Sequence, residues 1–213
     1  LAAATDFKRN YDSIQGGFGS APKFPSAHNL NFLLREGHRT GDQELTEMAI
    51  HSLKQMRLGG IYDQVGFGFH RYSTDASWHV PHFEKMLYDQ ASLMLAYTEA
   101  WEITADPLFL QTMEEILIYL NAKLRSPEGA YYSAEDADSD GEEGKFYVWS
   151  WSELQEVLNK AELEAMAPTF GIEPGGNFND EASRQVSGKN ILYVNSTMDY
   201  ASLLTDPIWL RAR

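Results

Sequence analysis

Residues 59–91 read GGIYDQVGFGFHRYSTDASWHVPHFEKMLYDQA, and this stretch indicates how the rest of the chain is organised. Its two leading glycines end one helical pattern, and its last residues begin another, MLYDQASLMLAYTEAWEI (86–103), which is apolar on nearly every side of a helix. Histidines and carboxylates cluster between the two patterns: His70, His79, His82, Asp75, Glu84 and Asp89. The chain therefore places acid–base groups where a buried helix begins.

Apolar residues recur at helical spacing on both sides of this stretch. Leu30, Leu33 and Leu34 predict a helix over 27–37 after a Ser26 N-cap, and Leu45 and Leu53 belong to a second pattern over 42–57. Two further patterns cover 82–104 and 107–125, with a proline suited to the first turn of the second, and a third pair covers 151–159 and 161–170. The sequence predicts three helical hairpins.

Short β-hairpins are expected in the connections between these helices. Alternating aromatic and polar residues predict them near 67–80 and 130–149, and ILYV predicts a strand within 190–195. We expect about six main helices and no large central sheet. The last segment, MDYASLLTDPIWLRAR (198–213), resembles the start of another helix.

Helix pairs alternate with glycine-aromatic loops at 16–25, 59–69 and, more loosely, 129–137. Such a rhythm is typical of stacked units that cannot bury their apolar faces alone. An all-α fold, a partial (α/α)6 toroid of about three helical hairpins with short β-hairpins in the loops, fits this pattern. An open helical solenoid is the alternative.

Composition excludes several classes of partner. The formal charge is −14, with 17 basic residues scattered among 31 acidic ones, which disfavours nucleic acid and anionic membranes. No apolar run approaches a membrane span, and LAAATDFKRN has no signal-peptide pattern, so we expect a soluble, cytoplasmic protein. The chain contains 0 cysteines, so a metal would need histidines and carboxylates.

Four segments carry a resemblance to a known family: GGFGSAPKFP (16–25), the stretch 59–91, YYSAEDADSDGEEGKFYVW (131–149) and GKNILYV (188–194). They resemble the thioredoxin-domain-containing proteins that include spermatogenesis-associated protein 20. The resemblance implies a toroid similar to N-acylglucosamine 2-epimerases and six-hairpin glycosidases, preceded in the family by a thioredoxin-like domain that is absent here.

The same resemblance implies that residues 1–213 form a fragment, about half of the ring. An open half ring exposes apolar helices at its edges, so we expect self-association in which one protomer supplies the missing half of another. We expect the fragment alone to be inactive.

The polar cluster suits sugar chemistry, which uses aromatic faces to stack on pyranose rings and acid–base groups to move protons. The catalytic candidates are His79, His82, Asp63, Glu84 and Asp89. The substrate-binding candidates are Tyr62, Trp78, His70, Arg71, Glu135 and Asp136. Epimerisation would use a histidine as the base and glycoside hydrolysis a carboxyl pair, and both stay open. The alternative is a non-catalytic binding or scaffold module in which these residues only brace the ring.

If the helix starts near 82, the chain makes a geometric prediction. His82 and Asp89 should then lie along one helix face and, with the preceding His79, line one concave pocket together with Asp63 and Tyr62 from the neighbouring loop. Lys85 should pair with a carboxylate.

Two motifs suggest metal binding. His79 and His82 have the count of a ligand pair, but Pro81 interrupts the helix that would align them. The loop DADSDGEEG (136–144) matches several calcium-loop positions, yet Tyr147 stands where the bidentate glutamate belongs. A looser calcium site or a solvated acidic turn remains for that loop. We expect no metal and no cofactor.

Overall fold

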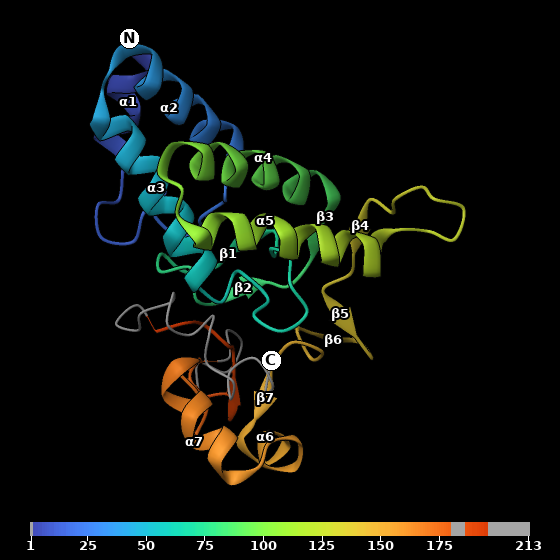
Figure 1. The fold of residues 1–213 in the computed structure, drawn as a ribbon. Coiled ribbons are helices and arrows are strands. Elements are labelled where there is room, and N and C mark those ends of the chain that lie inside the picture. The colour runs from blue at the N-terminus through green and yellow to red at the C-terminus, as the bar shows by residue number, and fades with distance from the viewer. Residues whose placement is uncertain (1, 180–185, 196–213) are drawn as a thin grey trace.

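The computed structural model describes residues 2–179 and 186–195, and within them helices dominate (Figure 1). The predicted all-α class, part of an (α/α)6 toroid, is confirmed. The helices are α1 (Ala2–Asn10), α2 (Ala27–Thr40), α3 (Gln43–Leu58), α4 (Leu87–Thr104), α5 (Pro107–Tyr119), the π-helical turn η1 (Leu120–Leu124), α6 (Trp151–Val157) and α7 (Lys160–Thr169).

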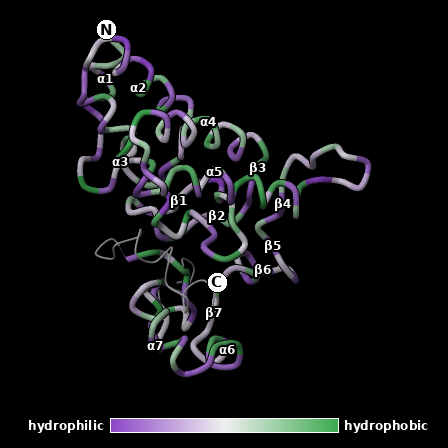
Figure 2. Tube along the Cα trace, viewed as in Figure 1, coloured by the Kyte–Doolittle hydropathy of each residue, from purple (hydrophilic) through white to green (hydrophobic). Residues whose placement is uncertain are grey.

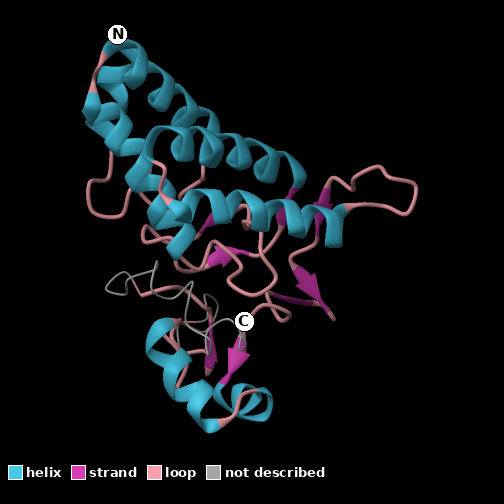
Figure 3. Ribbon diagram, viewed as in Figure 1, coloured by secondary structure: helices cyan, strands magenta, loops and turns pink. Residues whose placement is uncertain are grey.

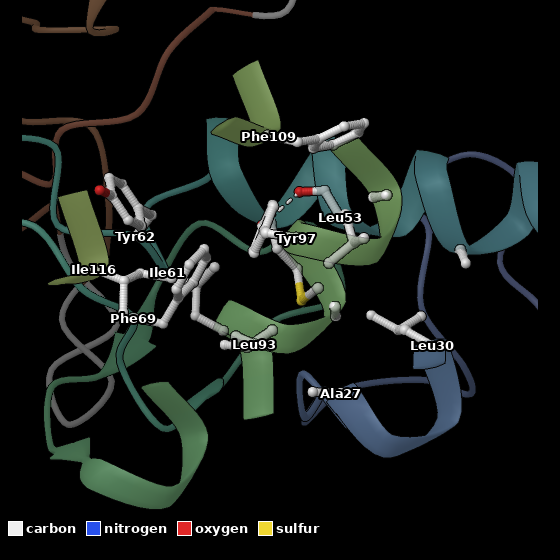
Figure 4. Packing of buried hydrophobic residues seen from close by; sticks show 14 of the residues in the cluster. Ala27, Leu30, Leu53, Ile61, Tyr62, Phe69, Leu93, Tyr97, Phe109 and Ile116 are labelled. Carbon is white, nitrogen blue, oxygen red and sulfur yellow. Dashed lines mark hydrogen bonds between the residues drawn. The ribbon is translucent and has the colours of Figure 1, made fainter. Parts of the chain in front are cut away.

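Helices α2 to α5 form two hairpins that share one core. Helix α2 packs on both α3 and α4, and α4 packs on α5. Leu30, Leu53 and Tyr97 meet inside this core, where the Tyr97 hydroxyl donates a 2.8 Å hydrogen bond to the Leu53 carbonyl (Figure 4). Hydrophobic and hydrophilic residues are interspersed along these helices (Figure 2), as expected for helices that bury one face.

Helices α6 and α7 form a third, shorter pair with its own apolar cluster. Both begin with a capping box: the Ser150 and Asn159 side chains each accept from a backbone N–H three residues later. Leu154, Met166 and Phe170 fill the cluster between them. Figure 1 places this pair apart from α2–α5, with β1, β2, β5 and β6 between them and β7 beside α6.

The strands form four two-stranded antiparallel sheets within the described residues, so no large central sheet interrupts the helical fold there (Figure 3). The pairs are β1 (Tyr72–Ser73) with β2 (Pro81–His82), β3 (Lys85–Met86) with β4 (Ala134–Glu135), β5 (Asp138–Ser139) with β6 (Glu142–Glu143), and β7 (Trp149–Ser150) with β8 (Lys189–Asn190).

Several boundaries differ from the prediction for identifiable reasons. The expected strand ILYV (191–194) does not form, and β8 ends just before it at Asn190. The Ile191 N–H donates to the Asn177 side chain, and Leu192 packs in the apolar cluster of α6 and α7, so neither residue joins a strand ladder. Helix α1 was missed, since it contains no buried residue and so lacks a strong periodic signal. The helical start suggested at 198–213 lies outside the described residues. None of the described helices combines the length and apolarity needed to cross a bilayer.

Candidate functional site

The chain before α4 is extended, and this decides which predicted site residues meet. The prediction of a helix from residue 82 is wrong, since α4 begins at Leu87 and residues 81–86 contribute to β2 and β3. Successive side chains of an extended segment point to opposite faces. Phe83 and Lys85 accordingly point into the protein, while His82 and Glu84 are partly exposed. Alternate residues of this segment therefore lie in two different environments, the buried interior and the partly exposed surface.

On the inner face, Lys85 forms a buried ion pair with Asp63. Its Nζ donates to Asp63 Oδ2 at 2.8 Å and to the Phe67 carbonyl at 2.8 Å. The ammonium also lies 4.7 Å from the ring centroids of both Tyr119 and Tyr147, within cation–π range. The prediction that Lys85 pairs with a carboxylate is confirmed.

Asp63 uses its second oxygen to hold its own loop. Oδ1 accepts from the backbone N–H groups of Val65 at 3.0 Å and Gly66 at 2.8 Å. Burial raises the pKa of the Asp63 carboxyl, but the Lys85 charge and these hydrogen bonds outweigh burial and hold the pKa below its ordinary value. Both carboxylate oxygens of Asp63 are therefore hydrogen-bonded inside the protein, which is the geometry of a brace.

His70 lies beside this pair as a neutral imidazole. Burial lowers its pKa to about 3, and the nearby Lys85 charge acts in the same direction. Its Nδ1 lies 2.8 Å from the Phe83 carbonyl, which can only accept, so Nδ1 carries the proton. Together with Tyr62 and Asp63, His70 lines a partly open cavity of about 220 Å³.

Two aromatic candidates are built into the core. Tyr62 is fully buried, and its hydroxyl donates a 2.6 Å hydrogen bond to Glu115, which also pairs with Arg57 at 2.8 Å. Trp78 is 0% exposed and donates from Nε1 to the Gln15 carbonyl at 2.8 Å. The prediction that Trp78 offers a ring face to a substrate is wrong, because its faces are covered by protein.

His79 lies in a second hollow of about 290 Å³, which Ser77 and Tyr193 also line. Burial lowers the pKa of His79, and its ring packs edge-on against Tyr193 at 4.8 Å. The prediction of a single pocket is therefore wrong, because His79 and Asp63 line different hollows. His82 and Asp89 line neither of these two hollows. The pleat of residues 81–86 and the late start of α4 separate them.

On the outer face, polar side chains form an ion pair and an adjoining imidazole–carboxylate contact. Arg71 donates to Glu84 at 2.9 Å, and His82 Nδ1 lies 2.6 Å from Glu143. His82 Nε2 lies 3.8 Å from the same Glu84 carboxylate, which links the two pairs. These side chains are between about one quarter and one half exposed, with 26% for both His82 and Glu84. They can reach a solute without rearrangement of the core.

Aromatic rings continue this exposed surface. The rings of Tyr72 and His82 stack with centroids 5.0 Å apart, because β1 and β2 set these residues directly opposite each other. Phe24, which is 51% exposed, lies 4.9 Å from Tyr72. We define the outer strip as Phe24, Arg71, Tyr72, His82, Glu84, Asp89 and Glu143.

Asp89 gives the outer strip a group that titrates near neutral pH. Burial raises the pKa of Asp89 to about 6, and the neighbouring Glu84 charge adds to the rise while Arg71 opposes it. Its Oδ2 atom is enclosed and has no hydrogen-bond partner among the described residues. A carboxyl with raised pKa and an unused position is typical of a group that handles protons.

The last two candidates lie away from the outer strip's charged pairs. Glu135 belongs to β4 opposite Lys85 and accepts from the Tyr119 hydroxyl at 2.8 Å. Asp136 is exposed, and within the described part of the chain it accepts only from the Asp138 backbone N–H at 3.1 Å. The loop after it forms the β5–β6 hairpin, and the described residues hold no cluster of three or more metal-binding side chains there or elsewhere.

Sequence reasoning missed three members of the outer strip: Phe24, Tyr72 and Glu143. A hairpin closed around TDAS would set Tyr72 opposite His79, whereas β1 and β2 set it opposite His82, so the local pattern did not reveal this pairing. Phe24 lies in a loop and Glu143 in β6, 58 and 61 positions from His82 (82 − 24 and 143 − 82), so only the tertiary fold brings them together.

The chain is 42% identical over 210 residues to spermatogenesis-associated protein 20 of Mus musculus and of Homo sapiens, matching 89% of the chain. It is 34% identical over 204 residues to uncharacterized protein B0495.5 of Caenorhabditis elegans. This chain belongs to the family of spermatogenesis-associated protein 20. It spans about a quarter of the relatives' length, 27% of the mouse and human proteins, and no protein-family model matches it.

Solved structures similar to this family member are toroids. A sugar epimerase from a ruminal bacterium aligns with a TM-score of 0.57 at 17% identity, over 63% of this chain and 37% of that one. Cellobiose 2-epimerase from Spirochaeta thermophila gives 0.57 at 20% identity, over 63% and 36%. An unsaturated glucuronyl hydrolase specific for heparin gives 0.50 at 16%, over 62% and 40%. At these identities the likeness establishes the fold alone.

Proposed function

We propose that the outer strip is a carbohydrate site and that this region belongs to a sugar-processing toroid of the epimerase or glycosidase kind. The observation that carries the proposal is Asp89, whose carboxyl has a pKa raised to about 6 and an unused, enclosed oxygen next to the Arg71–Glu84 pair. The toroid neighbours add support, because sugar epimerases and a glycosyl hydrolase share the fold.

Each part of the strip has a role that its chemistry suits. Phe24 offers an exposed ring for a pyranose face beside the partly buried ring of Tyr72, and Arg71 offers guanidinium donors for hydroxyl oxygens. Asp89 is about half protonated at pH 6, so it can donate a proton as a general acid. His82, held by Glu143, is the candidate base for epimerisation, and Glu84 is the candidate second carboxylate for hydrolysis.

A binding experiment tests the proposal on this chain. Backbone chemical shifts are recorded while cellobiose, glucose or N-acetylglucosamine is titrated into the labelled protein. We expect perturbations confined to the outer strip. Glu84→Gln should weaken binding by about tenfold, since it removes a charged hydrogen-bonding partner. Glu114→Gln on exposed α5 is the matched control and should leave binding unchanged.

The outcomes separate the candidate functions. Because the fragment alone is expected to be inactive, turnover is assayed with the full-length protein. Binding at the strip together with conversion of cellobiose supports the proposal, and the product distinguishes epimerisation from hydrolysis. Binding at the strip without turnover favours a non-catalytic binding module, which the saturated ion pairs of the strip also suit. Perturbations elsewhere, or none at millimolar sugar, would overturn a carbohydrate site here.

A further inference from the structure

The partly open cavity of about 220 Å³ lies on the inner face and is separate from the outer strip. Its floor is formed by side chains that are buried, and its mouth by side chains that are exposed. The floor residues used below are Tyr62, Gln64, His70, Phe83 and Ile191. The mouth residues are Val65, Lys123 and Phe146. A ligand that enters this cavity therefore contacts the exposed residues of the mouth, which include Lys123, before it reaches the buried residues of the floor.

The polar groups of the floor are bonded except at one position. The Tyr62 hydroxyl donates to Glu115, and the Gln64 amide is held by Arg57 and the Gly59 carbonyl. His70 donates from Nδ1 to the Phe83 carbonyl, so its Nε2 keeps a free lone pair. Nε2 has no partner among the described residues, and it is not one of their fully enclosed unpaired atoms. The floor thus offers His70 Nε2 as a hydrogen-bond acceptor.

That acceptor keeps its character across the physiological range. Burial lowers the pKa of His70 to about 3, so the ring stays neutral and Nε2 stays unprotonated near pH 7. A ligand that reaches the floor must donate a hydrogen bond there, because an acceptor atom would face the lone pair. The floor therefore selects a hydroxyl or amine donor.

The walls around this acceptor are aromatic and aliphatic. The rings of Phe83 and Tyr147 are nearly parallel, 9° apart with centroids at 5.7 Å, and Tyr147 meets His70 edge-on at 4.7 Å. Ile191 closes the floor beside Phe83 in the same apolar cluster. Flat aromatic ligands gain both apolar burial and ring contacts in such a site.

The mouth carries Lys123, whose ammonium group forms no ion pair with a carboxylate among the described residues. Lys123 lines the cavity, and its Nζ lies 5.8 Å from the Phe146 ring centroid. No ion pair joins it to a carboxylate in the described part of the chain. Asp63 also lines the cavity, but Lys85 neutralises it at 2.8 Å. The rim therefore favours an anionic group on the ligand.

We propose that this cavity binds a single-ring aromatic molecule that carries a hydroxyl at one end and a carboxylate at the other. The hydroxyl donates to His70 Nε2 on the floor, the ring lies among Phe83 and Tyr147, and the carboxylate faces Lys123 at the mouth. The volume is below the range of drug-sized pockets, which fits one ring rather than two.

A ligand series on the unmodified chain tests each contact. We use 4-hydroxybenzoate, benzoate and phenol as probes and follow the methyl signals of Val65, Ile191 and Leu192, which line the cavity. Benzoate lacks the donor and should bind about tenfold more weakly than 4-hydroxybenzoate, the upper range of one hydrogen bond. Phenol lacks the anion and should bind about two- to fivefold more weakly, the range of an exposed charge pair.

A surface variant checks the mouth without disturbing the core. Lys123→Gln should erase the preference for 4-hydroxybenzoate over phenol, while Lys160→Gln on exposed α7 should keep it. Unchanged circular dichroism verifies that both variants are folded. If benzoate binds as tightly as 4-hydroxybenzoate, or if no probe shifts the three methyl-bearing residues at millimolar concentration, the proposed ligand class is wrong.

Discussion

Replacing Lys85 with methionine should destabilise the protein more than any exposed charge substitution. The Lys85 side chain is 1% exposed and that of its partner Asp63 is 12% exposed, so the pair is shielded from water. Lys85→Met keeps the apolar stem but leaves Asp63 ionised and without its cation. Breaking a buried pair in this way costs about 3–5 kcal/mol, because one charge stays buried and uncompensated.

Two features of the site set where in this range the value falls. The Asp63 carboxylate keeps the Val65 and Gly66 N–H donors at 3.0 and 2.8 Å, which offset part of the loss. The ammonium's contacts with the Tyr119 and Tyr147 rings disappear, which adds about 0.5–2 kcal/mol. We therefore expect a loss of roughly 3–5 kcal/mol in the free energy of unfolding.

Urea unfolding followed by both tryptophan fluorescence and circular dichroism measures this loss, and coincident curves justify a two-state analysis. Asp63→Asn in the Lys85→Met background keeps the acceptor for both backbone donors but removes the charge. The double variant should recover about 2 kcal/mol of the loss. Lys145→Met is the control, since its pair with Asp140 is exposed and should give no measurable change.

The pH dependence of the stability loss in Lys85→Met gives an independent test of this assignment. In the parent protein the pKa of folded Asp63 is lowered, so its contribution is present above the unfolded pKa and is lost as pH falls through the lower folded pKa. Without Lys85, burial raises that pKa instead, so the deficit of Lys85→Met should shrink as pH falls toward 4. A loss below about 1 kcal/mol, or no recovery in the double variant, would refute the brace that we assign to this pair.

Three further predictions concern other parts of the molecule. Asp89→Asn should stabilise the protein at pH 7 by on the order of 2 kcal/mol, with the gain vanishing toward pH 4, because the raised folded pKa of about 6 costs stability as pH rises from the unfolded value; equal pH profiles in chemical denaturation would contradict this. Gly17→Ala should cost about 1–3 kcal/mol more than Gly19→Ala, since both have φ +75° but only the first would place a Cβ 2.5 Å from Trp78; thermal unfolding of the pair compares them. Ser150→Ala should cost about 1 kcal/mol by removing the α6 cap, and faster amide exchange limited to α6 would verify it.

The helical hairpins could be predicted from the sequence because the spacing of apolar residues along the chain indicates an amphipathic helix. Leu30, Leu33 and Leu34 recur along one face of α2, and all three are buried. The glycines at 59–60 mark the end of α3 within one residue. Such signals need only neighbours along the chain, so a single sequence contains them.

The arrangement of the polar cluster did not follow, because its pairings span long separations. Met86 pairs with Ala134 in β3 and β4, and that ladder keeps the segment before α4 extended where helical spacing suggested otherwise. The residues next to β3 in the sequence do not indicate that β4 is its pairing partner.

The sequence by itself determined which acid–base residues gather near the start of α4 and that Lys85 would pair with a carboxylate. Only the tertiary structure decided which of them share an environment: the pleat turns Lys85 toward Asp63 and His82 toward Glu143. The physical reason is that helix and strand periodicities assign the same residues to different faces, and the choice between them rests on long-range pairing rather than on local preference.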